Sequence, residues 1–82
     1  MTTFKKEYDF LDKKEIRANI SKNIKIYRLK ANMTQEQLAV NVDKSYDFIR
    51  RLEFRKGEIG CSIETLYRIS VVLKTPIDNF LK

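Results

Sequence analysis

The segment from Met33 to Glu53, MTQEQLAVNVDKSYDFIRRLE, has the pattern of two short helices joined by a tight turn. Thr34 and Gln37 have the spacing of a capping box, in which each side chain accepts a hydrogen bond from the other residue's backbone N–H. Met33 and Leu38 can form a hydrophobic staple, which fixes the direction in which the chain enters the helix. The apolar side of this helix is predicted to comprise Leu38, Ala39 and Val42.

A second helix is predicted after the polar interruption at residues 43–45, where Ser45 can act as the N-cap. Its buried face is expected to comprise Phe48, Ile49 and Leu52. Its outward face carries polar and basic side chains, which are Tyr46, Asp47, Arg50 and Arg51. A helix with such an exposed face has the groups needed to read base edges in the major groove of DNA.

The composition fits one small helical domain with a polyanionic partner. A chain of 82 residues with 43% hydrophobic residues can form a single packed core. Only 2 glycines and 1 proline are present, which favours helices with short connections over a many-turned β structure. The net charge of +6 favours binding to a polyanion such as nucleic acid.

The residue types present also exclude several kinds of site. The sequence has no histidine and one cysteine, so it lacks the residues for a His-based catalytic triad or an internal disulfide. A Cys/His metal site is nearly excluded for the same reason, and no cofactor is expected. No signal peptide or long apolar run is visible. We therefore expect a cytoplasmic binding protein that is not an enzyme.

Residues 1–11 are predicted to form a basic, aromatic N-terminal arm that precedes a helical domain at residues 12–82. Phe4, Tyr8 and Phe10 alternate with other residues, which allows a short extended segment. Three roles remain open for these aromatic side chains. They can pack on the core from outside, contact a second copy of the chain, or enter a DNA groove.

A long helix is predicted from Asp12, which has the spacing of a capping box with Glu15. Its core-facing stripe is expected to be Ile16, Ile20, Ile24 and Tyr27. Its basic residues fall on other faces, and most are interpreted as solvated: Lys13, Lys14, Arg17, Lys22, Lys25 and Lys30. Asn32 can adopt the left-handed conformation that ends a helix.

Two further helices are predicted after a connection that contains Gly57 and Gly60. Ser62 can cap the first of them, whose core stripe is expected to be Ile63, Leu66, Ile69, Ser70 and Leu73. Pro76 suits the first turn of the last helix. The apolar face of that helix is expected to comprise Ile77, Phe80 and Leu81.

Three motifs occur in order along the chain: MTQEQLA at residues 33–39, SYDFIRRLE at 45–53 and SIETLYRISVVLKTPID at 62–78. Their order and spacing resemble those of the Cro/C1-type helix-turn-helix family, the lambda-repressor-like domains. The resemblance covers about residues 23–81. It implies an all-α fold, a compact five-helix bundle in which residues 35–42 and 45–53 are the second and third helices. It also implies that the third helix lies in the major groove of double-stranded DNA.

The resemblance assigns site residues as well. It implies that Tyr46, Asp47 and Arg51 face base edges, and that backbone phosphates are contacted by Gln35, Ser45 and Arg50. The guanidinium of Arg51 can bond guanine O6 and N7 together. Asp47 can orient Arg51, accept from cytosine N4, or form only an exposed ion pair. Beyond this helix, two more basic residues are expected where the DNA backbone passes, Arg55 and Lys56.

The resemblance further implies an ion pair between Arg28 and Glu53 that holds the first and third helices in register. The sequence departs from the family pattern at two positions where glycine is usual, which are Asp43 and Arg55. The connection after Glu53 is also about two residues longer than usual. The third helix can therefore run on toward Lys56 before it ends.

The leading hypothesis is a sequence-specific transcriptional regulator, a repressor that binds a palindromic operator as a homodimer. The last two helices are predicted to supply the dimer contact through Tyr67, Val71, Val72, Pro76, Ile77 and Phe80. An antitoxin or a restriction–modification controller of the same fold fits equally well, with a toxin or RNA polymerase as a conceivable protein partner. The alternative from another class is a protein-interaction module that does not bind DNA. The basic cluster near the third helix argues against that module.

Overall fold

The computed structural model describes residues 8–54 and 57–82, and the fold of these residues is all-α. Four α-helices are followed by one short 3-10 helix within this part of the chain. The elements are α1 (Lys13–Lys30), α2 (Gln35–Asn41), α3 (Tyr46–Phe54), α4 (Ile63–Val72) and η1 (Ile77–Phe80). None of the described helices is both long and apolar enough to cross a membrane.

The all-α bundle confirms the predicted fold class, but the last of the five expected helices is a 3-10 turn rather than an α-helix. Pro76 is extended, with φ −55° and ψ 139°, so the new element starts only at Ile77. The backbone N–H of Asn79 then donates to the Pro76 carbonyl at 3.0 Å, which is an i to i+3 bond. An element of four residues is too short for the repeated i to i+4 hydrogen bonds of a regular α-helix.

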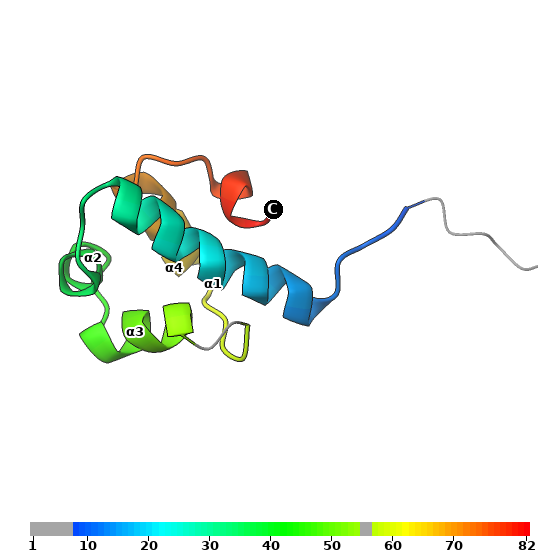
Figure 1. Ribbon diagram of the computed structural model, residues 1–82, viewed down its shortest axis with the longest axis horizontal. Helices are drawn as coiled ribbons and strands as arrows, with labels where there is room; N and C mark the ends of the chain where they lie inside the picture. The colour runs from blue at the N-terminus through cyan, green and yellow to red at the C-terminus, as the bar shows by residue number, and fades with distance from the viewer. Residues whose placement is uncertain (1–7, 55–56) are drawn as a thin grey trace, which may run out of the picture.

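Helix α1 runs through the middle of the molecule, with α2 and α3 along one side and η1 on the other (Figure 1). It packs against α3 and η1, while α2 packs against α3 and α4. The side chains enclosed by these helices form one apolar core: Ile24, Leu38, Ala39, Val42, Ile49, Leu52, Leu66, Ile69, Leu73 and Phe80. Each helix therefore buries one face and leaves the other for solvent or partners.

One expected core position of α4 lies outside the core. Ile63 is 68% exposed, because it lies in the first turn at the border of the buried face. Tyr67 and Val71 follow it at intervals of four residues and are 62% and 56% exposed. These three residues form an apolar stripe along the outer face of α4.

The predicted caps are present at the helices that form the motif. At α2, the Gln37 N–H donates to the Thr34 hydroxyl at 3.0 Å, and the Thr34 N–H donates to the Gln37 side chain at 2.8 Å. The Ser45 hydroxyl accepts from the Phe48 N–H at 3.0 Å, at the start of α3. The turn between the two helices contains Asp43 with φ 59°, which is the left-handed conformation that glycine usually supplies.

The described part of the N-terminal arm extends away from the bundle (Figure 1). Tyr8 and Phe10 are exposed, and their rings lie 6.5 Å apart. Packing of these two rings on the core, one of the three roles considered, is therefore wrong, while Phe4 lies outside the described residues. The arm gives way to α1 at the predicted capping box, where the Glu15 N–H donates to Asp12 at 2.8 Å.

Candidate nucleic-acid interface

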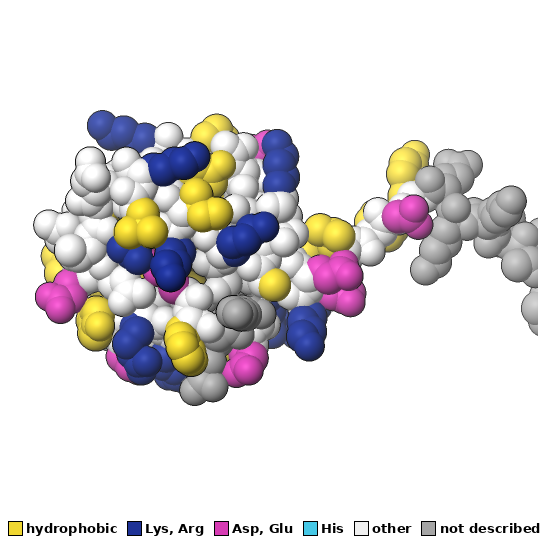
Figure 2. Space-filling model, in the orientation of Figure 1, with side chains coloured by type: hydrophobic (Ala, Val, Ile, Leu, Met, Phe, Trp, Pro, Cys, Tyr) yellow, Lys and Arg dark blue, Asp and Glu magenta, His cyan; other side chains and the backbone are white. Residues whose placement is uncertain are grey.

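Helix α3 has one face in the core and one face in solvent. Ile49 and Leu52 are buried, and Phe48 is half-buried against the core. The opposite face is exposed and carries the residues that the sequence identified, which are Tyr46, Asp47, Arg50 and Arg51. Helix α2 packs directly on α3, so the two helices together support this exposed face. Lys and Arg side chains gather over α1 and over α3 on the face shown in Figure 2.

The acidic residue on this face forms the expected ion pair with Arg51 and a closer one with Arg50. The Arg50 guanidinium lies 2.6 Å from Asp47, whereas Arg51 lies 3.8 Å from the other oxygen of the same carboxylate. The hydrogen bond from Arg50 lowers the pKa of Asp47, and the same bond raises the pKa of Arg50. Asp47 therefore restrains the Arg50 side chain more closely than the Arg51 side chain.

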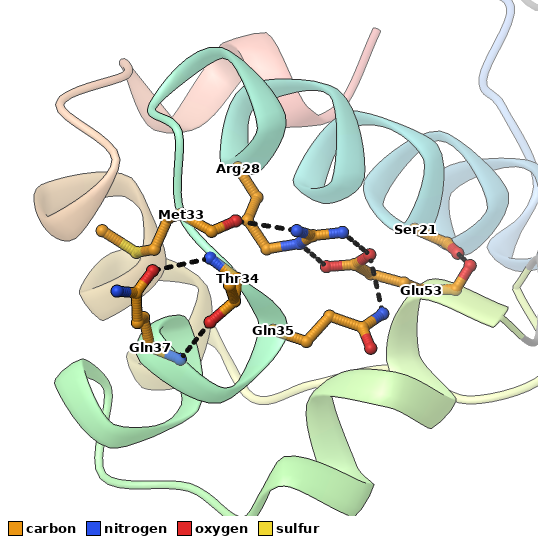
Figure 3. A network of polar contacts seen from close by, with 7 residues as sticks. All are labelled: Ser21, Arg28, Met33, Thr34, Gln35, Gln37 and Glu53. Atoms are coloured by element: carbon orange, nitrogen blue, oxygen red, sulfur yellow. Dashed lines mark hydrogen bonds and ion pairs between the residues drawn. The ribbon is translucent and has the colours of Figure 1, made fainter.

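A buried ion pair fixes α3 against α1 (Figure 3). Arg28 Nε donates to Glu53 Oε2 at 2.7 Å, and Arg28 Nη2 donates to Glu53 Oε1 at 2.9 Å. The Arg28 side chain is 8% exposed and that of Glu53 is 2% exposed. A third donor of the same guanidinium, Nη1, reaches the Met33 carbonyl at 2.8 Å, before α2 begins. The pair that the sequence suggested thus lies in a bidentate geometry.

Two more side chains complete this network. Gln35 Nε2 donates to Glu53 Oε1 at 3.1 Å, so Gln35, expected at a phosphate, bonds a carboxylate in the free protein. The hydroxyl of Ser21 donates to the Glu53 backbone carbonyl at 2.9 Å, near the end of α3. Sequence reasoning missed Ser21, although its place three residues before Ile24 puts it on the buried face of α1. A hydroxyl on a buried face requires a partner, and this requirement was the signal that could have found it.

The other predicted phosphate contacts have different outcomes. Ser45 is exposed at the start of α3, and its hydroxyl proton remains free to donate because its oxygen accepts from Phe48. Arg55 and Lys56 lie outside the described residues. Gly57, just after them, has φ 96° and approaches α1 closely.

One member of the predicted dimer contact must be corrected. Phe80 is wholly buried and meets the Tyr27 ring edge-on at 5.4 Å, so it has no surface to offer a partner chain. Its burial follows from its place at the end of η1, where it closes the core between α1 and α4. Val72 and Ile77 are half-buried and Pro76 is exposed, so their part in a dimer stays a prediction.

No group of three or more His, Cys, Asp or Glu residues is close enough to hold a metal ion within residues 8–54 and 57–82. The exposed side chains at α3 are suited to binding by charge, hydrogen bonds and stacking. The groups present are two guanidinium ions, a carboxylate, a phenol and a hydroxyl.

Comparison with known proteins agrees with this geometry. The chain matches a protein-family model described as helix-turn-helix over residues 24–80. Among solved structures, it resembles the crystal structure of the hypothetical transcription factor NHTF from Neisseria, with a TM-score of 0.72 and 18% sequence identity. That likeness covers 89% of this chain and 80% of the Neisseria chain, and at this identity it concerns the fold. A sequence comparison with curated proteins finds no match.

Proposed function

Because the chain belongs to the Cro/C1-type helix-turn-helix family of DNA-binding domains, we propose that it is a sequence-specific transcriptional regulator. The observation that carries the proposal is the amphipathic division of α3. Ile49 and Leu52 anchor one face in the core, while Arg50 and Arg51 stand exposed on the other. The Neisseria protein of similar fold is described as a hypothetical transcription factor, which supports the same role. Such a regulator acts on DNA inside the cell, which places it in the cytoplasm.

In this proposal α3 lies in the major groove and reads bases with Tyr46, Asp47 and Arg51. Arg51 suits guanine, because its guanidinium can bond O6 and N7 and is held less closely by Asp47 than Arg50 is. The backbone contacts come from Gln35, Ser45, Arg50, Arg55 and Lys56. The DNA-binding unit comprises residues 12–82, and the arm at residues 1–11 precedes it.

We further propose that the protein binds a palindromic operator as a homodimer and represses transcription. A single helix-turn-helix module buries a small interface, and two-fold pairing lets two modules read half-sites about one helical turn apart. Tyr67 and Val71 on α4 offer exposed apolar surface, and the other residues of the proposed contact are Val72, Pro76 and Ile77. An apolar stripe of this kind on a small domain is typical of a protein contact.

The test is selection of a binding site from a random DNA pool, followed by titration of the selected duplex over a salt series. A regulator of this kind should enrich one palindromic sequence and lose affinity steeply as salt rises. Arg51→Ala should cost about 1–3 kcal/mol and relax the preference at one base pair of each half-site. Arg68→Ala is a matched control, because it removes an arginine of α4 that donates to the Val42 carbonyl at 3.4 Å and does not belong to the exposed face of α3. This variant should keep the base preference of the parent protein.

The competing role, a protein-interaction module, predicts no enrichment of any sequence and no binding to duplex DNA even at low salt.

The dimer is tested separately by sedimentation of the free protein and of the protein–operator complex. Val71→Asp should give monomers while leaving the fold intact, because Val71 is exposed. A variant that stays dimeric would exclude the outer face of α4 as the contact.

A further inference from the structure

A small hollow lies where α1, α2 and α3 meet, beside the exposed face of α3. It has a volume of about 120 Å³ and is lined by Lys25 of α1, Gln35 of α2 and three residues of α3, which are Arg50, Glu53 and Phe54. Two of these side chains are cations, and Arg50 also belongs to the exposed face of α3. The hollow is therefore continuous with the surface proposed to meet DNA.

The Glu53 carboxylate lines the hollow, but its negative charge is already neutralised by hydrogen-bonded partners, so it does not prevent an anion from binding there. Both oxygens of Glu53 already accept hydrogen bonds, Oε2 from Arg28 and Oε1 from Arg28 and Gln35. Its charge is balanced by a bidentate guanidinium, and its side chain is almost fully buried. The charges that remain for a ligand at this hollow are those of Lys25 and Arg50.

Gln35 contributes a neutral donor to the same space. Its Nε2 carries two protons, and the bond to Glu53 uses one of them. Because an ionised carboxylate can only accept, this bond also fixes which end of the amide lies toward Glu53 (Figure 3). The second N–H remains available to an acceptor in the hollow.

We propose that this hollow binds a backbone phosphate of duplex DNA and that Lys25 is one of its direct ligands. The inference rests on the proposed function and adds a residue of α1 to the interface. A tetrahedral anion with several acceptor oxygens suits donors that converge from three helices, namely Lys25, Gln35 and Arg50. Phe54 is exposed at the rim, where the adjoining deoxyribose offers apolar surface. Arg50 reaches the phosphate by leaving Asp47, an exposed pair that is weak.

The other lysines of α1 provide a matched control for the charge of Lys25. Lys30 lies over the Tyr27 ring, with Nζ 5.2 Å from the ring centroid. It lines a different hollow together with residues of α4 and the segment that follows, Val72 and Thr75 among them. Lys30→Gln therefore removes the same charge from the same helix without touching the proposed phosphate site.

The experiment compares Lys25→Gln, Lys30→Gln and the parent protein in titrations of a mixed-sequence duplex and of the selected operator across a salt series. Removal of one phosphate ligand should reduce the slope of log affinity against log salt by about 0.9 per bound protomer. For Lys25→Gln this gives an affinity weaker by about five-fold for each bound protomer at physiological ionic strength, on the mixed-sequence duplex and on the operator alike. Lys25→Arg should restore binding, and Lys30→Gln should keep the parent slope.

Ethylation of individual phosphates gives a second, direct measurement. One ethylated phosphate per half-site should weaken the parent protein and Lys30→Gln strongly, and weaken Lys25→Gln less, because Gln35 and Arg50 remain as ligands of that phosphate in the variant. Equal slopes for the two glutamine variants, or the same loss of affinity on ethylation of that phosphate in Lys25→Gln as in the parent protein, would overturn the assignment of Lys25. If the parent protein itself shows no salt-dependent binding to any duplex, the proposed function fails and the inference fails with it.

Discussion

Removal of Arg28 should destabilise the protein more than any surface substitution. In Arg28→Ala the Glu53 carboxylate keeps only the bond from Gln35, and the Met33 carbonyl loses its side-chain donor. The side chains of the pair are 8% and 2% exposed, so water has little access to solvate the Glu53 carboxylate that is left without its partner. Breaking a buried ion pair by removing one partner costs about 3–5 kcal/mol. This cost is a large share of the roughly 5–15 kcal/mol that stabilises a domain.

The measurement is thermal or urea unfolding followed by circular dichroism. For a domain of this size, each kcal/mol lowers the melting temperature by about 4–8 °C, so Arg28→Ala should melt at least about 12 °C below the parent protein. Arg28→Lys should recover only part of this stability, because an ammonium cannot reproduce the bidentate contact or the Met33 bond.

The double variant Arg28→Met with Glu53→Leu separates the pair's net contribution from the cost of an orphaned charge. Replacing both partners by apolar side chains should restore most of the stability, because no buried charge remains. A destabilisation below about 1 kcal/mol for Arg28→Ala would place the pair in the range of exposed salt bridges. That result would refute the inference that burial makes the pair structural.

Three further predictions concern other parts of the molecule. Gly57→Ala should cost about 1–3 kcal/mol in urea unfolding, because φ is 96° and a Cβ would lie 2.8 Å from the Ala18 nitrogen. Asp47→Asn should tighten binding to mixed-sequence DNA about five-fold in low salt, since it releases Arg50; unchanged affinity would show that the pair does not restrain Arg50. Burial raises the pKa of the Cys61 thiol, so Cys61 should react with a disulfide reagent more slowly than free cysteine at neutral pH, and faster as pH rises.

The local signals in the sequence predict the fold well because they act over a few residues. The capping pair Thr34 and Gln37 and the Ser45 cap depend only on spacing, and all are present. Asp43 occupies the turn position where glycine is usual, and its φ of 59° agrees with the left-handed conformation expected there. The buried face of α3 follows from helical periodicity alone.

The parts that the sequence could not predict depend on how helices pack. Periodicity places all the α1 lysines outside the core, but only the approach of α2 and α3 to α1 puts Lys25 at their junction. Phe80 lies in a segment of four residues, too short for a pattern to tell a core face from a dimer face. The partner of Asp47 depends on side-chain conformation, because Arg50 and Arg51 are both within reach.

Stability and DNA recognition meet in this molecule at a single carboxylate. Glu53 Oε1 accepts from Arg28, which holds α1 on α3, and from Gln35, which lies beside the proposed phosphate site. Changes at Glu53 should therefore alter unfolding and DNA affinity together. Arg51 and Lys25 are exposed and outside this network, so their substitution should change affinity alone. A Glu53→Gln variant that binds DNA like the parent after its stability has been restored elsewhere would show that the two roles are separable.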